Sequence, residues 1–242
     1  MSAAQHAHTG NVGRVTLAHA GAGALNEPLM HAAPQLPDRN AALAQYRRRA
    51  GVYDLELAAF EPIRRRAVLE LGLRPGDTVI DAGCGTGLSF HLLQAAVRER
   101  GHIVGLEQCP DMLAQARSRV DEAGWRNVTL VCAPAEEADI AITADAALLH
   151  FTHDILRRPE ALDAVFRCLR PGAQVVAAGL KWAPPWAWPV NLLVWSAALY
   201  STTLIDGLEA PWSHLAARLR GLEVEPLLLG GAFIARGEVA RR

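Results

Sequence analysis

From residue 38 onward, short apolar runs rich in β-branched residues alternate with stretches in which apolar positions recur at helical spacing. The apolar runs predict strands at 78–80, 102–106, 127–131, 144–149 and 173–180. The amphipathic stretches predict helices at 39–50, 55–72, 87–100, 110–123, 157–169 and 211–220. Strands that alternate with helices in this way build a parallel sheet with helices on both faces.

The C-terminal part of the chain breaks this alternation. Residues 223–229 and 232–236 predict two strands on either side of Gly230 and Gly231, a pattern typical of a hairpin. We therefore expect an α/β fold whose doubly wound, mostly parallel sheet ends in an antiparallel strand.

The N-terminal residues 1–37 are rich in Ala, His and Gly and show no steady period. We interpret them as a flexible leader. With 242 residues, the chain is long enough for one large domain, which we expect to span residues 38–242.

Composition argues against several classes of protein. The chain has 24 Lys and Arg against 25 Asp and Glu, a net charge of −1, whereas a surface that binds a nucleic-acid backbone needs excess positive charge. Hydrophobic residues make up 51% of the chain, which is ample for a buried core. The four cysteines form no CxxC pair, so we predict neither a disulfide framework nor a metal site, and scattered cysteines suit the cytoplasm.

A glycine-rich turn follows the first predicted strand. Gly83, Gly85 and Gly87 alternate with other residues just before a predicted helix. Glycine lets the backbone turn sharply and lets a ligand approach the main chain. A dinucleotide loop would read GxGxxG, whereas this one reads GxGxG with Asp81 before it. Because an acid there would repel a pyrophosphate, Asp81 favours a ligand with a cationic or amino group.

A second acid, Glu107, closes the next strand. A carboxylate at this place can accept both hydroxyls of a ribose. The combination of Asp81, three alternating glycines and Glu107 is much more specific than a glycine loop alone.

This combination resembles the class I S-adenosylmethionine-dependent methyltransferases, of the type that acts on small molecules or lipid headgroups. The resemblance covers residues 40–180 and, more loosely, the C-terminal hairpin. It implies S-adenosylmethionine as the cofactor and a Rossmann-like sheet of seven strands, the last of them antiparallel.

By this resemblance, the amino group of the cofactor faces Asp81 and its ribose hydroxyls face Glu107. The full set of residues that the resemblance places at the cofactor is Asp81, Gly83, Cys84, Gly85, Thr86, Gly87, Glu107, Gln108, Met112, Ala135, Glu136 and His150. One position departs from the family pattern. Pro134 stands where an acid often reaches the adenine amine, so we expect backbone near Ala135, or the side chain of Glu136, to take its place.

Three residues are candidates for a catalytic role. Methyl transfer from a sulfonium mainly needs alignment of the nucleophile, and only some acceptors need a base. His150 and His153, at the end of the fourth predicted strand, are candidate bases, although we favour a backbone role for His150 and a solvated position for His153. Tyr53 belongs with Tyr46 to a segment that resembles the N-terminal lid of these enzymes, expected at residues 38–72, and simple helix packing is the alternative.

Residues 182–210 form an apolar insertion after the fifth strand. They include an uncharged run, 190–205, which is shorter than the about 20 residues that a bilayer span needs. Four tryptophans in or beside this run favour a membrane interface. We expect this segment to form a lid over an apolar acceptor, with peripheral membrane contact through residues 182–205. The alternative is a core helix that is buried in the domain or in a homodimer.

We therefore expect a cytoplasmic, membrane-associated methyltransferase that modifies nitrogen or oxygen of a small, apolar or amphiphilic molecule. N-methylation ranks first, because no residue is a compelling base. The alternatives are a non-catalytic S-adenosylmethionine-binding protein of the same fold, a nicotinamide-dependent oxidoreductase, and a methyltransferase that acts on protein. The charge balance argues against a nucleic-acid partner.

Overall fold

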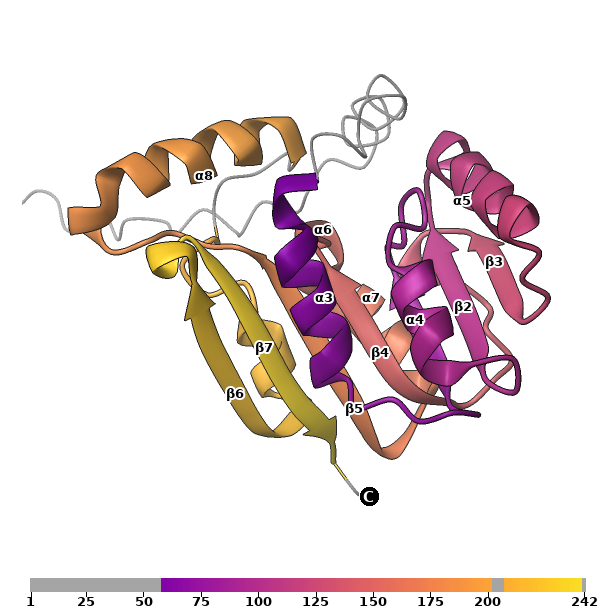
Figure 1. The fold of residues 1–242 in the computed structure, drawn as a ribbon. Coiled ribbons are helices and arrows are strands. Elements are labelled where there is room, and N and C mark those ends of the chain that lie inside the picture. The colour runs from indigo at the N-terminus through magenta and orange to yellow at the C-terminus, as the bar shows by residue number, and fades with distance from the viewer. Residues whose placement is uncertain (1–57, 202–206, 241–242) are drawn as a thin grey trace, which may run out of the picture. The chain divides into compact units, whose positions relative to one another are not determined.

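The fold is seen in a computed structural model, which describes residues 58–201 and 207–240. These residues form a seven-stranded sheet of order β3-β2-β1-β4-β5-β7-β6 (Figure 1). The strands are β1 (Thr78–Ala82), β2 (His102–Glu107), β3 (Val128–Cys132), β4 (Ala144–His150), β5 (Leu169–Leu180), β6 (Leu219–Leu227) and β7 (Ala232–Val239).

Strand β7 is the one that differs in direction. It runs antiparallel to both of its neighbours, β5 and β6, whereas the pairs that join β3, β2, β1, β4 and β5 are all parallel. The chain order reverses between β1 and β4, the point at which doubly wound sheets bind their ligands. The predicted fold, mostly parallel with an antiparallel last strand, is confirmed.

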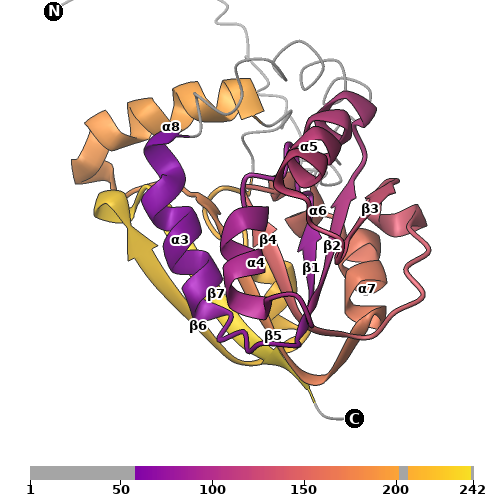
Figure 2. The same ribbon diagram turned by 45° about the vertical axis from the view of Figure 1, so that its right-hand side comes forward.

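Helices cover both faces of the sheet (Figures 1 and 2). The helices are η1 (Ala58–Phe60), α3 (Glu61–Glu70), α4 (Phe90–Val97), α5 (Pro110–Ala123), η2 (Ala135–Glu137), α6 (His153–Leu156), α7 (Pro159–Arg167), η3 (Pro185–Ala187), α8 (Trp188–Ser201), α9 (Ser213–Ala216) and η4 (Leu228–Gly230). On one face, Val68 of α3, Leu93 of α4 and Leu113 of α5 share an apolar core. On the other face, Leu156 of α6 and Leu162 of α7 belong to a second core.

The helix after the glycine turn begins later than predicted. We expected it at 87–100, but α4 spans Phe90–Val97. Gly87 has φ +78°, which is incompatible with a right-handed helix, so the helix starts only after the turn ends. At the other end, Arg98 also leaves the helical region, with φ +59°.

Other predicted boundaries were wrong for tertiary reasons. The helix expected at 211–220 is reduced to α9, Ser213–Ala216, because Leu219 already pairs with Val239 in the β6–β7 ladder. The fifth strand starts at Leu169 rather than at 173, since Leu169 pairs with Ala144 before a register shift. The described part of the helix expected at 55–72 contains η1 and α3 in place of one continuous helix.

Several expectations lie outside the described residues. They concern the leader 1–37, the first lid helix at 39–50 and the tyrosines Tyr46 and Tyr53. The apolar insertion is described up to Ser201 and again from Gly207, and its helix is α8.

Candidate functional site

The turn between β1 and α4 is built by its alternating glycines. Gly83, Gly85 and Gly87 have φ values of +76°, +56° and +78°, a backbone region that disfavours residues with a Cβ atom. The N–H groups of Gly83 and Cys84 both donate to the carbonyl of Leu106, at 2.7 and 2.9 Å. The turn is therefore fixed against the end of β2.

Glu107 ties the glycine turn to the beginning of α5. Its carboxylate accepts the N–H of Gly85 at 3.0 Å and the N–H of Cys109 at 2.7 Å. Its side chain lies at the carboxyl end of β2, and the residue is 7% exposed. Burial raises the pKa of Glu107 to about 7, although the hydrogen bond from the N–H of Cys109 opposes this shift.

Asp81 is the residue before the last in β1, directly ahead of this turn. The residue is 2% exposed, and its Oδ2 atom has no hydrogen-bond partner among the described residues. Burial raises the pKa of Asp81 to about 7, the positive charge of Arg64 lowers it, and the negative charge of Glu107 raises it further. A buried carboxylate oxygen without a partner costs free energy, and a ligand with an N–H or cationic group would supply that partner.

Arg64 is a site residue that the sequence did not reveal. It lies on α3, is 2% exposed and forms an ion pair with Glu61. Its charge acts on both Asp81 and His150. In the sequence it is one of three consecutive arginines, and only packing distinguishes it, since Arg65 and Arg66 are much more exposed.

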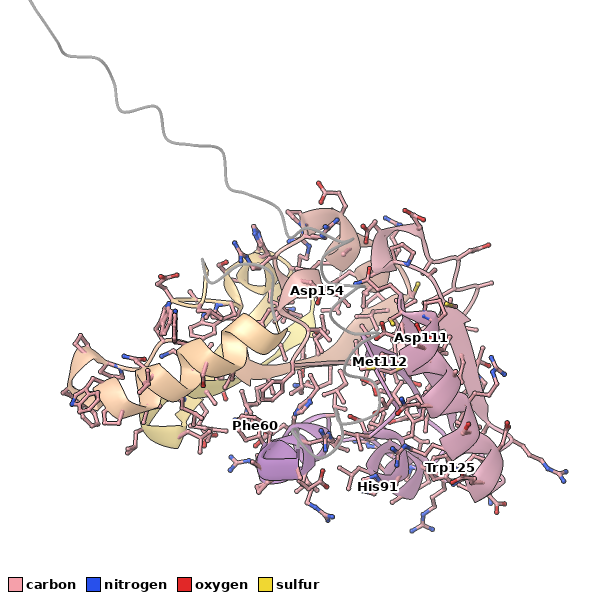
Figure 3. The ribbon with its side chains drawn as sticks, turned by 90° about the horizontal axis from the view of Figure 1, so that it is seen from above. Phe60, His91, Asp111, Met112, Trp125 and Asp154 are labelled. Atoms are coloured by element: carbon pink, nitrogen blue, oxygen red, sulfur yellow. The ribbon has the colours of Figure 1, made fainter. Side chains whose placement is uncertain are left out.

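The residues expected around the adenine come from three elements. Figure 3 looks onto the carboxyl edge of the parallel strands, with Met112 on α5 and Asp154 on α6. Gln108 donates to Asp154 at 3.2 Å, and Met112 is buried. The Glu136 carboxylate, a proposed substitute for the missing acid, lies 3.2 Å from a guanidinium nitrogen of Arg158.

Some predicted residues of the glycine turn face the protein interior. The Cys84 side chain is buried in the first apolar core, and a Cβ atom on Gly105 would lie 3.0 Å from its sulfur. Thr86 is buried as well. These two residues therefore have their backbone, rather than an exposed side chain, to offer a ligand.

His150 is the last residue of β4, the strand that pairs with β1 just ahead of the glycine turn. It is 9% exposed, and its Nε2 atom has no hydrogen-bond partner in the described parts of the chain. Burial lowers the pKa of His150 to about 3, and the charge of Arg64 acts in the same direction. The imidazole is therefore neutral at pH 7 and a weak base.

His153 is buried rather than solvated as we favoured. Its Nε2–H donates to the carbonyl of Leu180 at 2.8 Å, and its ring lies against Gly179 and edge-on to Phe233. Burial lowers its pKa, although the hydrogen bond to Leu180 opposes the shift. These contacts are with β5 and β7, on the sheet side of α6.

Part of the chain is similar to a known protein family. Residues 79–172 match the family model described as a methyltransferase domain. These residues form a class I S-adenosylmethionine-dependent methyltransferase domain. The predicted family and its cofactor, S-adenosylmethionine, are confirmed at the level of this domain.

Curated relatives of the methyltransferase domain carry several activities in their names. A malonyl-[acyl-carrier protein] O-methyltransferase from Serratia marcescens is 28% identical over 152 residues, which are 62% of this chain and 57% of that protein. Aklanonic acid methyltransferase DauC from Streptomyces sp. (strain C5) is 29% identical over 119 residues, 49% of this chain and 54% of that protein. The chain thus spans little more than half the length of these relatives.

Solved structures share the fold of the methyltransferase domain. The N-methyltransferase NodS from Bradyrhizobium japonicum WM9, in complex with S-adenosylhomocysteine, has a TM-score of 0.62 at 14% identity. The likeness covers 83% of this chain and 99% of that one. At this identity the likeness establishes the fold alone.

The residues of the methyltransferase domain suit S-adenosylmethionine. The partnerless Oδ2 of Asp81 matches an amino group, and the buried Glu107 carboxylate at the neighbouring strand end matches hydroxyl donors. Among residues 58–201 and 207–240, no three His, Cys, Asp or Glu side chains are grouped so that they would hold a metal ion.

Proposed function

We propose that the chain is an S-adenosylmethionine-dependent methyltransferase whose acceptor is a small, apolar or amphiphilic molecule. The observation that carries this proposal is the pair of buried carboxylates, Asp81 and Glu107, at neighbouring strand ends beside the GxGxG turn. Asp81 would hold the amino group of the cofactor and Glu107 its ribose hydroxyls.

When bound, the cofactor supplies an electrophilic methyl group on a sulfonium. Asp81 and Glu107 would hold the cofactor so that this methyl group could pass to a lone pair of the acceptor, with S-adenosylhomocysteine as the other product. The protein has to align the acceptor, exclude water and let any acceptor proton depart.

The low basicity of His150 favours acceptors that react without first losing a proton to a base. Burial and Arg64 lower the pKa of this imidazole to about 3, so it would take a proton from an acceptor only weakly. An uncharged amine needs no such base. We therefore propose nitrogen ahead of oxygen as the acceptor atom.

Two other functions make different predictions for the same pocket. A non-catalytic protein of this fold would bind S-adenosylmethionine and transfer nothing. A nicotinamide-dependent oxidoreductase would bind a pyrophosphate compound, which the buried Asp81 disfavours by charge repulsion. Calorimetry with S-adenosylhomocysteine and with NADH separates these alternatives.

The cofactor role is tested with Glu107→Ala. We expect S-adenosylhomocysteine to bind about tenfold more weakly or worse, because the ribose hydroxyls lose their acceptor. Gly124→Ala, at the end of α5, is the control and should keep the parental affinity. Unchanged affinity in Glu107→Ala would remove this residue from the ribose site.

The transferase role is tested by a product screen. The full chain is incubated with S-adenosylmethionine labelled in the methyl group and with metabolite and lipid extracts. Mass spectrometry then identifies any molecule that gains the label. Cofactor binding with no labelled product from any extract would favour the non-catalytic alternative.

We also propose that α8 and the preceding η3 form a lid that contacts a membrane surface, so that the cytoplasmic protein associates with it peripherally. The apolar face consists of Trp186, Trp188, Leu192, Leu193 and Trp195, which are 46–69% exposed. Helix α8 carries no acidic or basic residue in its first or last turn. None of the helices within residues 58–201 and 207–240 is long and apolar enough to span a bilayer. A homodimer that buries the same face is the competing explanation.

A further inference from the structure

Phe151, the residue after β4, has an unusual backbone conformation. Its φ is +59°, in the left-handed region, where a bulky side chain is strained. The backbone is held there because the N–H of Phe151 donates to the carbonyl of Ala178 on β5 at 2.7 Å. Glycine would meet the same backbone requirement without strain.

The strained backbone places the Phe151 ring in a row of three rings. Its centroid lies 4.9 Å from that of Phe60, at an interplanar angle of 49°. On the other side it lies 4.7 Å from the imidazole of His150, at 51°. Both phenylalanine rings are half-buried, so each keeps surface in reach of a ligand.

This row of rings lies next to the glycine turn, because it includes His150, the last residue of β4. Strands β1 and β4 pair with Asp81 opposite Leu148. His150, at the end of β4, and Gly83, just after β1, each follow two residues later. Close packing continues past the strand end, since a Cβ atom on Gly83 would lie 2.3 Å from Cγ2 of Thr152. Phe151 therefore stands between two residues that flank the glycine turn.

Phe60 and Phe151 both pack against the first apolar core, but packing alone does not account for the backbone of Phe151. A residue whose only task is to fill the core gains nothing from a strained backbone, and such strain tends to be retained where it serves a site. The adjacent His150 also keeps a buried nitrogen that has no partner in the described residues. A flat apolar ligand with one polar atom would use both features.

We propose that Phe60 and Phe151 form an aromatic platform on which the methyl acceptor stacks, and that this acceptor carries a planar ring. The inference rests on the proposed function and adds the chemical class of the substrate. A planar ring can make offset or tilted contacts with the faces of the phenylalanine rings, which add to the binding free energy. A linear acyl chain cannot make these contacts. The partnerless nitrogen of His150 would hydrogen-bond a polar substituent of the ring.

The test uses the full chain saturated with S-adenosylhomocysteine. Two probes are titrated by calorimetry: 2-naphthol, a planar ring with one hydroxyl, and decanoate, a linear chain of ten carbons. We expect the parent protein to bind 2-naphthol about tenfold more tightly than decanoate. Equal binding of the two probes, or tighter binding of decanoate, would overturn the planar-ring class.

The variant Phe151→Gly removes the ring and the backbone strain together. We expect 2-naphthol to bind about tenfold more weakly, with S-adenosylhomocysteine affinity unchanged. Arg98→Gly is the matched control, since Arg98 also has φ +59° but lies at the far end of α4, and it should keep the parental affinity for both ligands. A purely structural Phe151 would lower the melting temperature and leave the 2-naphthol affinity unchanged.

Phe60→Leu provides an independent check, because leucine keeps the apolar contact and removes the ring. We expect a loss of 2-naphthol affinity of roughly threefold. Unchanged 2-naphthol affinity in both phenylalanine variants, in a protein that still binds S-adenosylhomocysteine, would overturn the platform alone. A parent protein that does not bind S-adenosylhomocysteine would overturn the proposed function itself.

Discussion

At the scale of single residues, the candidate site contains groups whose burial or backbone conformation is unfavourable for folding. Asp81 and Glu107 are carboxyl groups whose pKa values burial raises to about 7, and the backbone of Phe151 is strained. Each feature costs folding free energy when no ligand is bound. A site of this kind is organised in advance for charged and polar groups.

Asp81→Asn should separate stability from binding. At pH 8 the variant should be more stable than the parent, by up to about 4 kcal/mol, because each pKa unit corresponds to about 1.4 kcal/mol and the folded-state pKa is raised from 3.8 to about 7. S-adenosylhomocysteine should bind the variant more weakly, since the partner of its amino group has lost its charge. Chemical denaturation and calorimetry measure the two effects. A variant that is less stable and binds equally well would contradict the role of Asp81.

The same pair of proteins gives a pH dependence with a defined sign. Because the pKa of Asp81 is raised in the folded state, ionised Asp81 lowers the free energy of unfolding by its full amount above about pH 7. This loss shrinks as the pH falls towards the pKa of Asp81 in the unfolded chain, 3.8. The stability advantage of Asp81→Asn should therefore shrink from pH 8 to pH 5. The two proteins must be compared because His150 and His153 also make stability depend on pH. Their pKa values are lowered in the folded state, so both the parent and the variant become less stable as the pH falls over the same range. An advantage that is constant with pH would show that the Asp81 pKa is not raised.

His153→Ala should reduce stability by about 2–3 kcal/mol, because it removes a buried hydrogen bond to Leu180 and leaves a cavity beside Phe233. Affinity for S-adenosylhomocysteine should stay within about twofold of the parental value. Thermal denaturation and calorimetry measure the two effects. Lost turnover in a variant of parental stability would instead support His153 as the base.

At the scale of elements, the unit formed by β1, the glycine turn and β2 was well predicted from the sequence. Alternating glycines reveal where the backbone must be left-handed, and a strand end reveals where Glu107 must lie. Arg64 and Phe151 could not be found in this way. The burial of Arg64 depends on how α3 packs, and the φ of Phe151 depends on a hydrogen bond from β4 to β5, neither of which has a local signature. Helix ends failed for a related reason, since the pairing of Leu219 with Val239 overrides a local helical pattern.

Gly83→Ala compared with Gly124→Ala separates crowding from backbone strain. Both glycines have positive φ, +76° and +68°, but a Cβ atom on Gly83 would lie 2.3 Å from Thr152, while nothing lies within 4 Å of one on Gly124. Gly124→Ala should cost about 1–2 kcal/mol and leave ligand binding intact. Gly83→Ala should cost more and abolish S-adenosylhomocysteine binding, because the turn must move. Equal effects in the two variants, measured by denaturation and calorimetry, would show that crowding at Gly83 is unimportant.

At the scale of the described domain, the residues proposed to hold the cofactor lie at one edge of the sheet, and α8 adds an exposed apolar face. In Figure 1, α8 runs across the end of the sheet at which the parallel strands finish. The sequence predicted an apolar helix here, but not which residues it leaves exposed, because an almost uniformly apolar helix has no pattern that marks its outer face.

The exposed face is tested with the combined variant Trp188→Ser, Leu192→Gln and Trp195→Ser. We expect the parent to cosediment with vesicles of phosphatidylcholine and phosphatidylglycerol, and the variant to bind about fivefold more weakly or worse. Leu69→Gln, an exposed leucine on α3, is the control. Sedimentation velocity on the same samples detects the alternative, since a homodimer that dissociates in the variant, without any vesicle binding by the parent, would replace the membrane proposal.

The reversed direction of β7 has a practical consequence for handling the protein. Because β7 runs opposite to its neighbours, its last residue, Val239, lies at the edge where the parallel strands start, whereas the glycine turn follows the carboxyl end of β1. A biotin acceptor peptide or a fluorescent reporter joined after Val239 would sit on that distal side. Immobilising the chain through a tag at this position should therefore leave the glycine turn on the side away from the support.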